Sequence, residues 1–288
     1  VAAITPWNYP VSMITRKVGP ALAAGCTVVL KPAEATPLSA IKVFEILAEA
    51  GVPDGVINLV TTSNPAPVGE EFVSNPLVRK LTFTGSTAVG KMLAGKAAGN
   101  MKRVSCELGG HAPFLVFDDA DPVHAAKGVQ LVKFLNTGQA CISPNRIFVH
   151  QSKVDAFVDT LQSRVAGMQA GSGFEEGVTI GPLVDERAVT KVSAQVDDAV
   201  AKGAEVVCGG NRLISNGLDK GFFYAPTVLR GVTPDMLIYR EETFGPVAPI
   251  ITFEDDQEAL KMANDTHYGL AAYVYTRDIS RAMRMFEE

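Results

Sequence analysis

At 288 residues the chain is longer than a typical domain of about 100 to 200 residues, so we expect two domains, with one large α/β domain as the alternative. Hydrophobic residues make up 47% of the sequence and charged residues 20%, which excludes a disordered or a membrane-spanning class. The net charge of −5 argues against nucleic acid as a partner. No apolar stretch is long enough to cross a bilayer, so we expect a cytoplasmic protein without a membrane partner.

Short β-branched runs alternate with longer segments of helical periodicity between residues 26 and 108. The expected strands lie at 26–31, 56–60, 79–84 and 102–108, and the expected helices at 37–51 and 86–99, with a polar connection at 61–78. Such alternation predicts a parallel sheet with crossover helices, of the doubly wound nucleotide-binding type.

The elements change character after the Gly109-Gly110 turn, where we place a domain boundary. We expect strands at 112–117 and 146–150, helices at 122–136, 154–168 and 187–202, and a more β-rich tail. The sequence begins without methionine inside an apolar run and ends within an expected helix, which suggests a piece of a longer chain.

The segment FTGSTAVGKM at 83–92 follows an expected strand and begins an expected helix. A glycine turn before a helix N-terminus presents free N–H groups to an anion, so the segment predicts either a phosphate site or a structural corner. Met92 stands where a P-loop has the Ser or Thr that holds magnesium, and the G-x-G-x-x-G fingerprint is absent. A P-loop NTPase is therefore the weaker alternative.

Two charged residues, Lys31 and Glu34, follow the strand at 26–31 and so belong to the carboxyl edge of the expected sheet. Ligands of open α/β sheets bind at this edge, where a carboxylate can accept hydrogen bonds from ribose hydroxyls. The alternative is a solvated loop charge.

Glu107 ends an apolar strand just before two glycines. The residues alone leave two readings, a salt-bridged carboxylate or a general base whose pKa is raised by burial. Cys141 stands in a loop of small and polar residues, and it is the one cysteine of four with the surroundings of a nucleophile, although a loop cysteine can be incidental. The four histidines have no ligand spacing, so we expect no metal site.

Six motifs in this order make the chain similar to the aldehyde dehydrogenase superfamily along nearly its whole length. They are ITPWNYP at 4–10, KPAE at 31–34, FTGST at 83–87, CELGG at 106–110, NTGQAC at 136–141 and EETFGP at 241–246. The resemblance implies an α/β fold with a parallel-sheet Rossmann-type NAD(P)-binding domain at 1–109 and an α/β catalytic domain at 110–288. It also implies that an N-terminal part of the first domain and a C-terminal part of the second are missing.

The resemblance implies an NAD(P)-dependent oxidation of an aldehyde to the carboxylic acid. Cys141 would attack the aldehyde carbon, and Asn8 and the Cys141 backbone N–H would hold the oxyanion. Glu107 would activate the water that hydrolyses the thioester, which favours water over coenzyme A as acceptor. Lys17 matches a lysine implicated in proton relay.

For the cofactor, the resemblance implies contacts from both domains. The residues are Thr5, Trp7, Lys31, Glu34, Gly69, Gly85, Ser86, Leu108, Glu242 and Phe244. Because a 2′-phosphate beside the Glu34 carboxylate would meet like charge, we expect NAD to be preferred, with NADP possible. The full-length protein is expected to be a homodimer or homotetramer that acts on a small-molecule aldehyde.

The stretch at 13–40 most resembles the succinate-semialdehyde dehydrogenases, in which an arginine at the position of Arg16 binds the substrate carboxylate. Leu135 replaces a second arginine of those enzymes, and Ser143 replaces a regulatory cysteine. Another semialdehyde or a longer aldehyde is therefore the alternative substrate, and an inactive truncated fragment is the alternative that is not an enzyme.

Overall fold

The computed structural model describes residues 1–288, and the chain divides into two compact units, Val1–Gly109 and Gly110–Glu288. We call these unit 1 and unit 2 and describe each by itself. The division lies at the glycine pair where the sequence predicted a domain boundary. The roles of the two units in cofactor binding and catalysis remain predictions.

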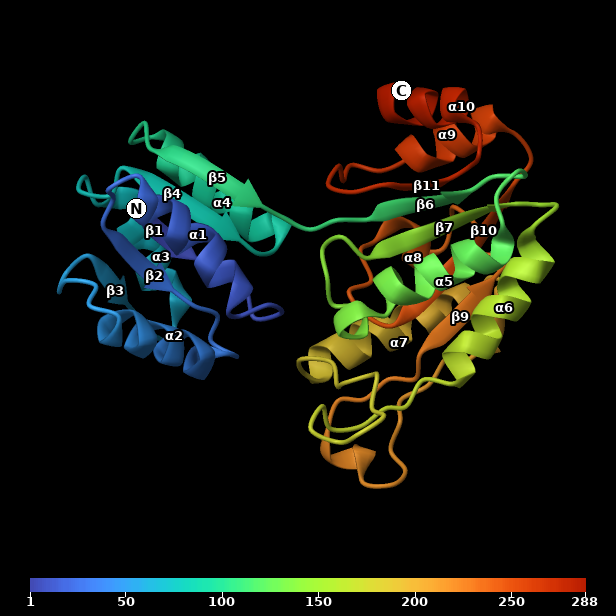
Figure 1. Cartoon of the computed structure of the whole chain (residues 1–288), viewed down its shortest axis with the longest axis horizontal. Coiled ribbons are helices and arrows are strands. Elements are labelled where there is room, and N and C mark those ends of the chain that lie inside the picture. The colour runs from blue at the N-terminus through green and yellow to red at the C-terminus, as the bar shows by residue number, and fades with distance from the viewer. The chain divides into compact units, whose positions relative to one another are not determined.

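Unit 1 is built on a five-stranded sheet in which every paired strand is parallel (Figure 1). The strands are β1 (Ala2–Ile4), β2 (Val28–Lys31), β3 (Ile57–Leu59), β4 (Lys80–Thr84) and β5 (Arg103–Glu107). Their order is β3-β2-β1-β4-β5, so the chain runs outward from β1 in one direction and then from β4 in the other. The point between β1 and β4 is the topological switch point at which open α/β sheets bind ligands.

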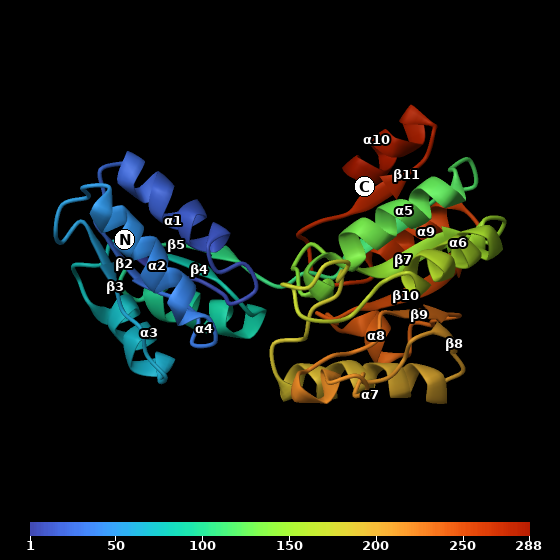
Figure 2. The same ribbon diagram turned by 60° about the horizontal axis from the view of Figure 1, so that its bottom comes forward.

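Helices cover both faces of this sheet (Figure 2). They are α1 (Ser12–Ala23), α2 (Pro37–Glu49), α3 (Pro65–Ser74) and α4 (Thr87–Ala98). Ala3 points into a core with α1 and α2, whereas Ala2 and Ile4 point into a core with α3 and α4. This alternation follows from the period of two along a strand, and it makes the unit a doubly wound α/β layer structure, as predicted.

Unit 2 contains a six-stranded sheet of order β11-β6-β7-β10-β9-β8 (Figure 1). The strands are β6 (Ala112–Val116), β7 (Pro144–His150), β8 (Glu205–Cys208), β9 (Thr227–Arg230), β10 (Val247–Phe253) and β11 (Tyr273–Tyr275). All pairs are parallel except β8 with β9. The predicted α/β fold class is therefore confirmed in both units.

Six helices accompany the sheet of unit 2. They are α5 (Pro122–Lys133), α6 (Val154–Ala166), α7 (Glu186–Ala201), α8 (Leu237–Arg240), α9 (Asp256–Asn264) and α10 (Ile279–Glu287), with short 3₁₀ turns η1 (Leu135–Gly138) and η2 (Leu218–Lys220). One buried core joins the sheet to α5 and α6, and another joins it to α7, α8 and α9. The sheet is therefore covered on both faces. The Asp121 carboxylate caps α5 by accepting from the backbone N–H of Val123 at 2.9 Å.

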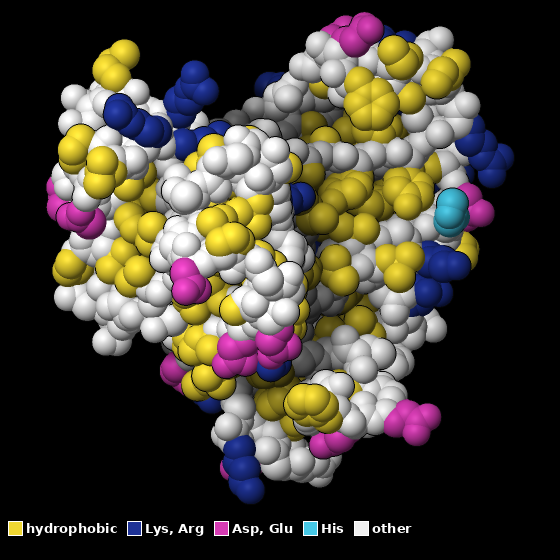
Figure 3. Space-filling view, turned by 60° about the vertical axis from the view of Figure 1, so that its left-hand side comes forward, with side chains coloured by type: hydrophobic (Ala, Val, Ile, Leu, Met, Phe, Trp, Pro, Cys, Tyr) yellow, Lys and Arg dark blue, Asp and Glu magenta, His cyan; other side chains and the backbone are white.

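Charged side chains of both signs are distributed over the face of the molecule in Figure 3. Among the helices, none is long and apolar enough to cross a membrane.

Candidate active site

The proposed cofactor residues of unit 1 gather mainly at the carboxyl ends of its parallel strands. Thr5 follows β1, Lys31 ends β2, Gly85 follows β4 and Glu107 ends β5. Because parallel strands end at one edge of the sheet, these residues from distant parts of the sequence share one edge, which is the edge where doubly wound sheets bind ligands.

The glycine turn after β4 leads directly into α4. Ser86 is the N-cap of α4, and its hydroxyl oxygen accepts from the backbone N–H of Val89 at 3.4 Å. A Cβ at Gly85 would lie 2.6 Å from the Phe83 ring, so a larger residue here would have to displace that side chain. The helix has no acidic residue in its first turn, and its N-terminus suits the phosphates of a dinucleotide.

The second glycine of this segment, Gly90, lies within α4 and serves packing. A Cβ at Gly90 would lie 2.3 Å from Cδ2 of Leu108, so the glycine makes room for the residue that follows β5. Gly69 is buried in α3, where an added Cβ would lie 3.6 Å from Cδ2 of Leu93 in α4, an ordinary contact distance. Gly69 thus lies at a helix-helix contact within unit 1.

Lys31 and Glu34 form an ion pair at the end of β2. The Lys31 ammonium is buried and also donates to the carbonyl of Pro32 at 2.8 Å, whereas the Glu34 side chain is 41% exposed. Burial acts to raise the pKa of Glu34, but hydrogen bonding and the charge of Lys31 outweigh it and hold the pKa below its ordinary value. The carboxylate is therefore ionised and partly neutralised by its partner.

Lys17 of α1 points into unit 1, where its ammonium donates to Thr82 Oγ1 at 3.0 Å. Burial lowers the pKa of Lys17 to about 8, while the charge of Glu107 acts in the opposite direction. Glu107 itself is exposed and forms no salt bridge, so the structure has neither the salt-bridged carboxylate nor the buried one that the sequence left open. Arg16, the residue before Lys17 in α1, is exposed.

Two further residues of the ITPWNYP motif, Trp7 and Asn8, lie in the bend after β1 and are half-buried. Thr5 is buried, and its backbone N–H donates to the carbonyl of Lys31 at 3.1 Å. This hydrogen bond continues the pairing of β1 with β2 by one residue.

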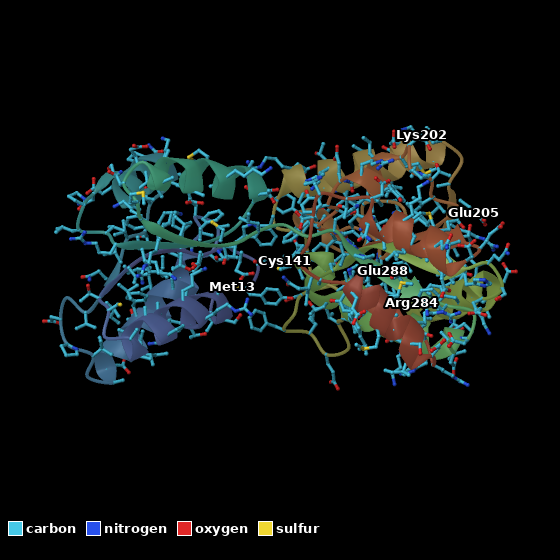
Figure 4. All side chains as sticks on the ribbon, turned by 90° about the horizontal axis from the view of Figure 1, so that it is seen from above. Met13, Cys141, Lys202, Glu205, Arg284 and Glu288 are labelled. Carbon is cyan, nitrogen blue, oxygen red and sulfur yellow. The ribbon has the colours of Figure 1, made fainter.

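The loop that carries Cys141, which is labelled in Figure 4, has an unusual backbone. Asn136, Thr137 and Gly138 have φ values of 49°, 59° and 74°, in the left-handed region. This conformation is uncommon for a β-branched residue and persists only where the surroundings impose it. It also ends α5 at Lys133, so the helix predicted over 122–136 stops three residues earlier.

A segment far along the chain imposes this conformation. The Thr137 hydroxyl donates to the Gly181 carbonyl and accepts from the Gly181 N–H, both at 3.1 Å. Gln139 donates to the carbonyl of Pro182 at 3.2 Å and accepts from the N–H of Val184 at 2.9 Å. The residues before Cys141 are thus fixed by four hydrogen bonds to 181–184, and the nucleophile candidate starts from an ordered backbone.

Two close backbone contacts complete the packing of the loop. A Cβ at Gly110 would lie 2.0 Å from the carbonyl oxygen of Cys141, and one at Gly138 would lie 2.1 Å from that of Gly245. Neither glycine can be replaced without moving backbone.

Cys141 is half-buried, as are the other three cysteines, and no cysteine is in a disulfide. Burial raises the pKa of the thiols of Cys106 and Cys208. The Tyr273 hydroxyl of β11 donates to the carbonyl of Ile142 at 2.9 Å, and burial followed by the charge of Cys141 raises the pKa of Tyr273. Tyr273 is a neighbour of Cys141 that the sequence did not indicate, because the two residues meet only in the folded sheet.

The EETFGP motif lies in unit 2 with Cys141. The Glu242 carboxylate accepts from the backbone N–H of Gly110 at 2.9 Å. Burial raises the pKa of Glu242, against that hydrogen bond and the charges of Lys191 and Lys133. Phe244 is half-buried and has a φ of 55°, so it too departs from ordinary backbone geometry. No group of three or more His, Cys, Asp or Glu side chains is placed to hold a metal ion.

The sequence model of the aldehyde dehydrogenase family matches residues 1–288, and the chain belongs to that family. It is 53% identical to succinate-semialdehyde dehydrogenase (NADP(+)) of Escherichia coli, with 99% of this chain and 58% of that protein covered. It is 52% identical to glutarate-semialdehyde dehydrogenase of Pseudomonas aeruginosa, with 100% and 58% covered. The predicted family is confirmed, and the P-loop NTPase alternative is removed.

A solved structure agrees. Succinate-semialdehyde dehydrogenase from Burkholderia pseudomallei is similar with a TM-score of 0.96 and 52% identity, over 99% of this chain and 58% of that one. The chain therefore spans less than two thirds of the length of these relatives.

Proposed function

We propose that the protein oxidises an aldehyde to the carboxylic acid with NAD(P), through a covalent intermediate on Cys141. The observation that carries this proposal is the ordered, left-handed loop that presents a half-buried cysteine in a chain of the aldehyde dehydrogenase family. Groups of both units take part in the one reaction, so each unit contributes a different share of the chemistry.

In the first step the Cys141 thiolate forms a bond to the aldehyde carbon, and the carbonyl oxygen becomes an oxyanion. The backbone N–H of Cys141 and the side-chain amide of Asn8 donate hydrogen bonds to this oxyanion. A nicotinamide held at this site would accept the hydride that leaves the former aldehyde carbon as the carbon–oxygen double bond re-forms, which gives the thioester.

In the second step Glu107 takes a proton from water, and the water oxygen attacks the thioester carbon. The carbon–sulfur bond breaks, the carboxylic acid leaves, and Cys141 is restored as a thiolate. The exposed position of Glu107 is compatible with proton exchange with solvent. Burial lowers the pKa of Lys17 to about 8, so its ammonium can exchange a proton near neutral pH.

The cofactor is assigned to the carboxyl edge of the sheet of unit 1. The N-terminus of α4 with Ser86 suits the diphosphate, and Lys31 with Glu34 suits the adenosine ribose. Glu34 favours NAD, since its carboxylate repels a 2′-phosphate. Its ion pair with Lys31 weakens that repulsion, and the E. coli relative is named for NADP(+).

The cofactor preference is tested with Glu34→Gln. If Glu34 selects against the 2′-phosphate, kcat/KM with NADP rises severalfold relative to NAD in the variant. An exposed glutamate elsewhere, Glu45, provides the matched control as Glu45→Gln. A wild-type protein with higher kcat/KM for NADP than for NAD contradicts the preference.

The substrate is assigned as an aldehyde with a second, anionic end, and succinate semialdehyde is the first choice. The support is the exposed guanidinium of Arg16, one residue before Lys17, together with relatives named for succinate and glutarate semialdehydes. Leu135 supplies no second arginine, so another semialdehyde or an aliphatic aldehyde is the alternative.

Arg16→Ala should lower kcat/KM for succinate semialdehyde about tenfold or more, while kcat/KM for an uncharged aldehyde of equal length is unaffected. Arg103→Ala, a change at an exposed arginine of β5, is the control.

The decisive experiment is a NAD(P) reduction assay with succinate semialdehyde on wild type, Cys141→Ala and Cys208→Ala. Cys141→Ala should abolish turnover, whereas Cys208→Ala, a change at a half-buried thiol in β8, should keep it. Turnover in Cys141→Ala refutes the mechanism.

The alternative of an inactive fragment requires that the 288-residue chain alone shows no turnover while NAD still raises its melting temperature. The full-length protein is proposed as a homodimer or homotetramer, which sedimentation measures.

A further inference from the structure

A buried lysine of unit 2 is not used by the proposed mechanism. Lys133, the last residue of α5, is fully buried, with a relative exposure of 0%. Its ammonium donates to Oδ1 of Asn145 in β7 at 2.8 Å. Moving an ammonium out of water costs several kcal/mol after relaxation, and an apolar residue of similar volume would avoid that cost.

Asn145 also forms a hydrogen bond with Gly110, a residue that packs against the backbone of Cys141. It is fully buried, and its side-chain amide donates to the carbonyl of Gly110 at 3.3 Å. The N–H of Gly110 donates to Glu242 at 2.9 Å. The Gly110 residue is thus held by its carbonyl and by its N–H, from β7 and from the EETFGP motif.

Gly110 also packs closely against the backbone carbonyl of Cys141. A Cβ there would lie 2.0 Å from the Cys141 carbonyl oxygen and 3.2 Å from its carbonyl carbon. Any displacement of Gly110 toward Cys141 must therefore move the peptide that carries the nucleophile. Lys133, Asn145, Gly110 and Cys141 form one continuous series of contacts within unit 2.

The charges of Lys133 and Glu242 also interact across this series of contacts. Burial lowers the pKa of Lys133 to about 7, and the charge of Glu242 acts to raise it. The charge of Lys133 in turn lowers the pKa of Glu242. The lysine and the carboxylate on either side of Gly110 therefore stabilise each other's charged forms.

We propose that Lys133 is a positioning residue of the reaction, which holds Asn145 against the Gly110 carbonyl and so fixes the peptide of Cys141. This inference rests on the proposed function, in which Cys141 is the nucleophile. Lys133 touches no reacting atom; it acts through Asn145 and Gly110.

The test compares Lys133→Met and Asn145→Asp with wild type. Lys133→Met removes the ammonium and keeps the volume. Asn145→Asp keeps an acceptor for Lys133 and strengthens that pair, but it loses the donor to Gly110. The control is Gln195→Met, because Gln195 is a buried polar side chain of α7 whose amide has no hydrogen-bond partner.

The first readout is the rate at which iodoacetamide alkylates Cys141, measured by peptide mapping with Cys208 as the reference thiol of the same unit. We expect Lys133→Met and Asn145→Asp to change the Cys141 rate at least fivefold, with Cys208 and the Gln195→Met control within twofold of wild type. The second readout is steady-state turnover, in which kcat falls about tenfold or more and KM changes little, since position and not ground-state binding is altered.

Wild-type alkylation of Cys141 and wild-type kcat in both variants overturn the proposal. If Lys133→Met does not fold, Asn145→Asp decides, since it is isosteric and preserves the lysine pair. The alkylation readout needs no aldehyde or cofactor. A wild-type protein that oxidises no aldehyde would therefore refute the proposed function and leave the positioning of Cys141 by Lys133 separately measurable.

Discussion

The two units hold their proposed functional residues in opposite ways. In unit 1 most of the residues assigned to the cofactor lie at strand ends, and Ser86, Glu34 and the proposed base Glu107 are exposed. In unit 2 the Cys141 loop is held by buried polar groups, close glycine contacts and left-handed backbone. A ligand that must enter and leave needs accessible groups on a rigid edge, whereas a nucleophile needs one fixed position. Changes of equal size should therefore affect activity in unit 2 far more than in unit 1.

The largest expected effect is that of Gly110→Ala. The added Cβ would meet the backbone of Cys141, which has no flexible end to move aside, so the nucleophile must shift. A displacement of about 1 Å can cost about 100-fold in rate, and we expect a fall of that order in kcat. Steady-state kinetics measures it, with Gly173→Ala as control because nothing lies within 4 Å of a Cβ there. Equal rates in the two variants would show that the Cys141 backbone is not constrained by Gly110.

The next effect concerns the strained loop. Thr137→Val keeps the shape of the side chain but removes both hydrogen bonds to Gly181, which should destabilise unit 2 by about 1 to 3 kcal/mol. Thr137→Ser keeps the hydroxyl and relieves the β-branched side chain at positive φ, so it should be near wild type. Hydrogen exchange of β7 peptides under denaturant measures the difference, and equal losses in both variants would show that the two hydrogen bonds to Gly181 do not account for the effect.

A third effect appears in the pH dependence of stability. The folded-state pKa of Lys133, about 7, lies below its ordinary value of 10.5, so between these values the unfolded chain binds more protons and stability rises with pH. Lys133→Met removes this contribution. Its stability relative to wild type should be greatest below pH 7 and decline above it, by on the order of 1 kcal/mol between pH 7 and pH 8.

The comparison includes the groups around Lys133. The charge of Glu242 raises the pKa of Lys133 in wild type, and in the variant the pKa of Glu242 lies higher because the charge of Lys133 no longer lowers it. Burial lowers the pKa of His111 to about 3, so this neighbour stays neutral throughout, and Arg146 stays charged. Unfolding in denaturant, monitored by hydrogen exchange of β7 and β10 peptides from pH 6 to 10, measures the difference in the free energy of unfolding between Lys133→Met and wild type. A constant difference would mean that Lys133 is not titrating in this range.

The smallest effect is in unit 1. Gly95 is an exposed position in the interior of α4, and nothing lies within 4 Å of a Cβ there. Gly95→Ala should stabilise unit 1 by about 0.5 to 1 kcal/mol through helix propensity, without changing kcat. Trp7, the only tryptophan in the chain, reports unfolding of unit 1 by fluorescence. A destabilised Gly95→Ala would mean that α4 is not a regular helix at this position.

Much of the fold could be read from local pattern. Four strands of unit 1 were predicted because β-branched runs stand between helical segments. β1, the central strand, was not, since Ala2–Ile4 is three residues long and shows no alternation. α3 was taken as a polar connection because Pro65–Ser74 contains proline, glycine and two glutamates, and only its packing on α4 makes its apolar residues core.

The site was predictable where chemistry is local and not where it depends on tertiary contacts. Cys141 and Glu107 stand out by their neighbours in the sequence. Lys133 reads as an ordinary lysine at a helix end, and its burial results from the packing of α5 on the sheet. The positive φ of Thr137 runs against the preference of threonine, and it is imposed by residues 181–184.

The order of strand pairing determines when each unit can fold during synthesis on the ribosome. The five strands described for unit 1 all lie within residues 2–107. In unit 2, β6 is the first strand made, and it lies between β7 and β11, the last. One edge of β6 therefore stays unpaired until Tyr273–Tyr275 emerge, which leaves an open sheet edge in the nascent chain.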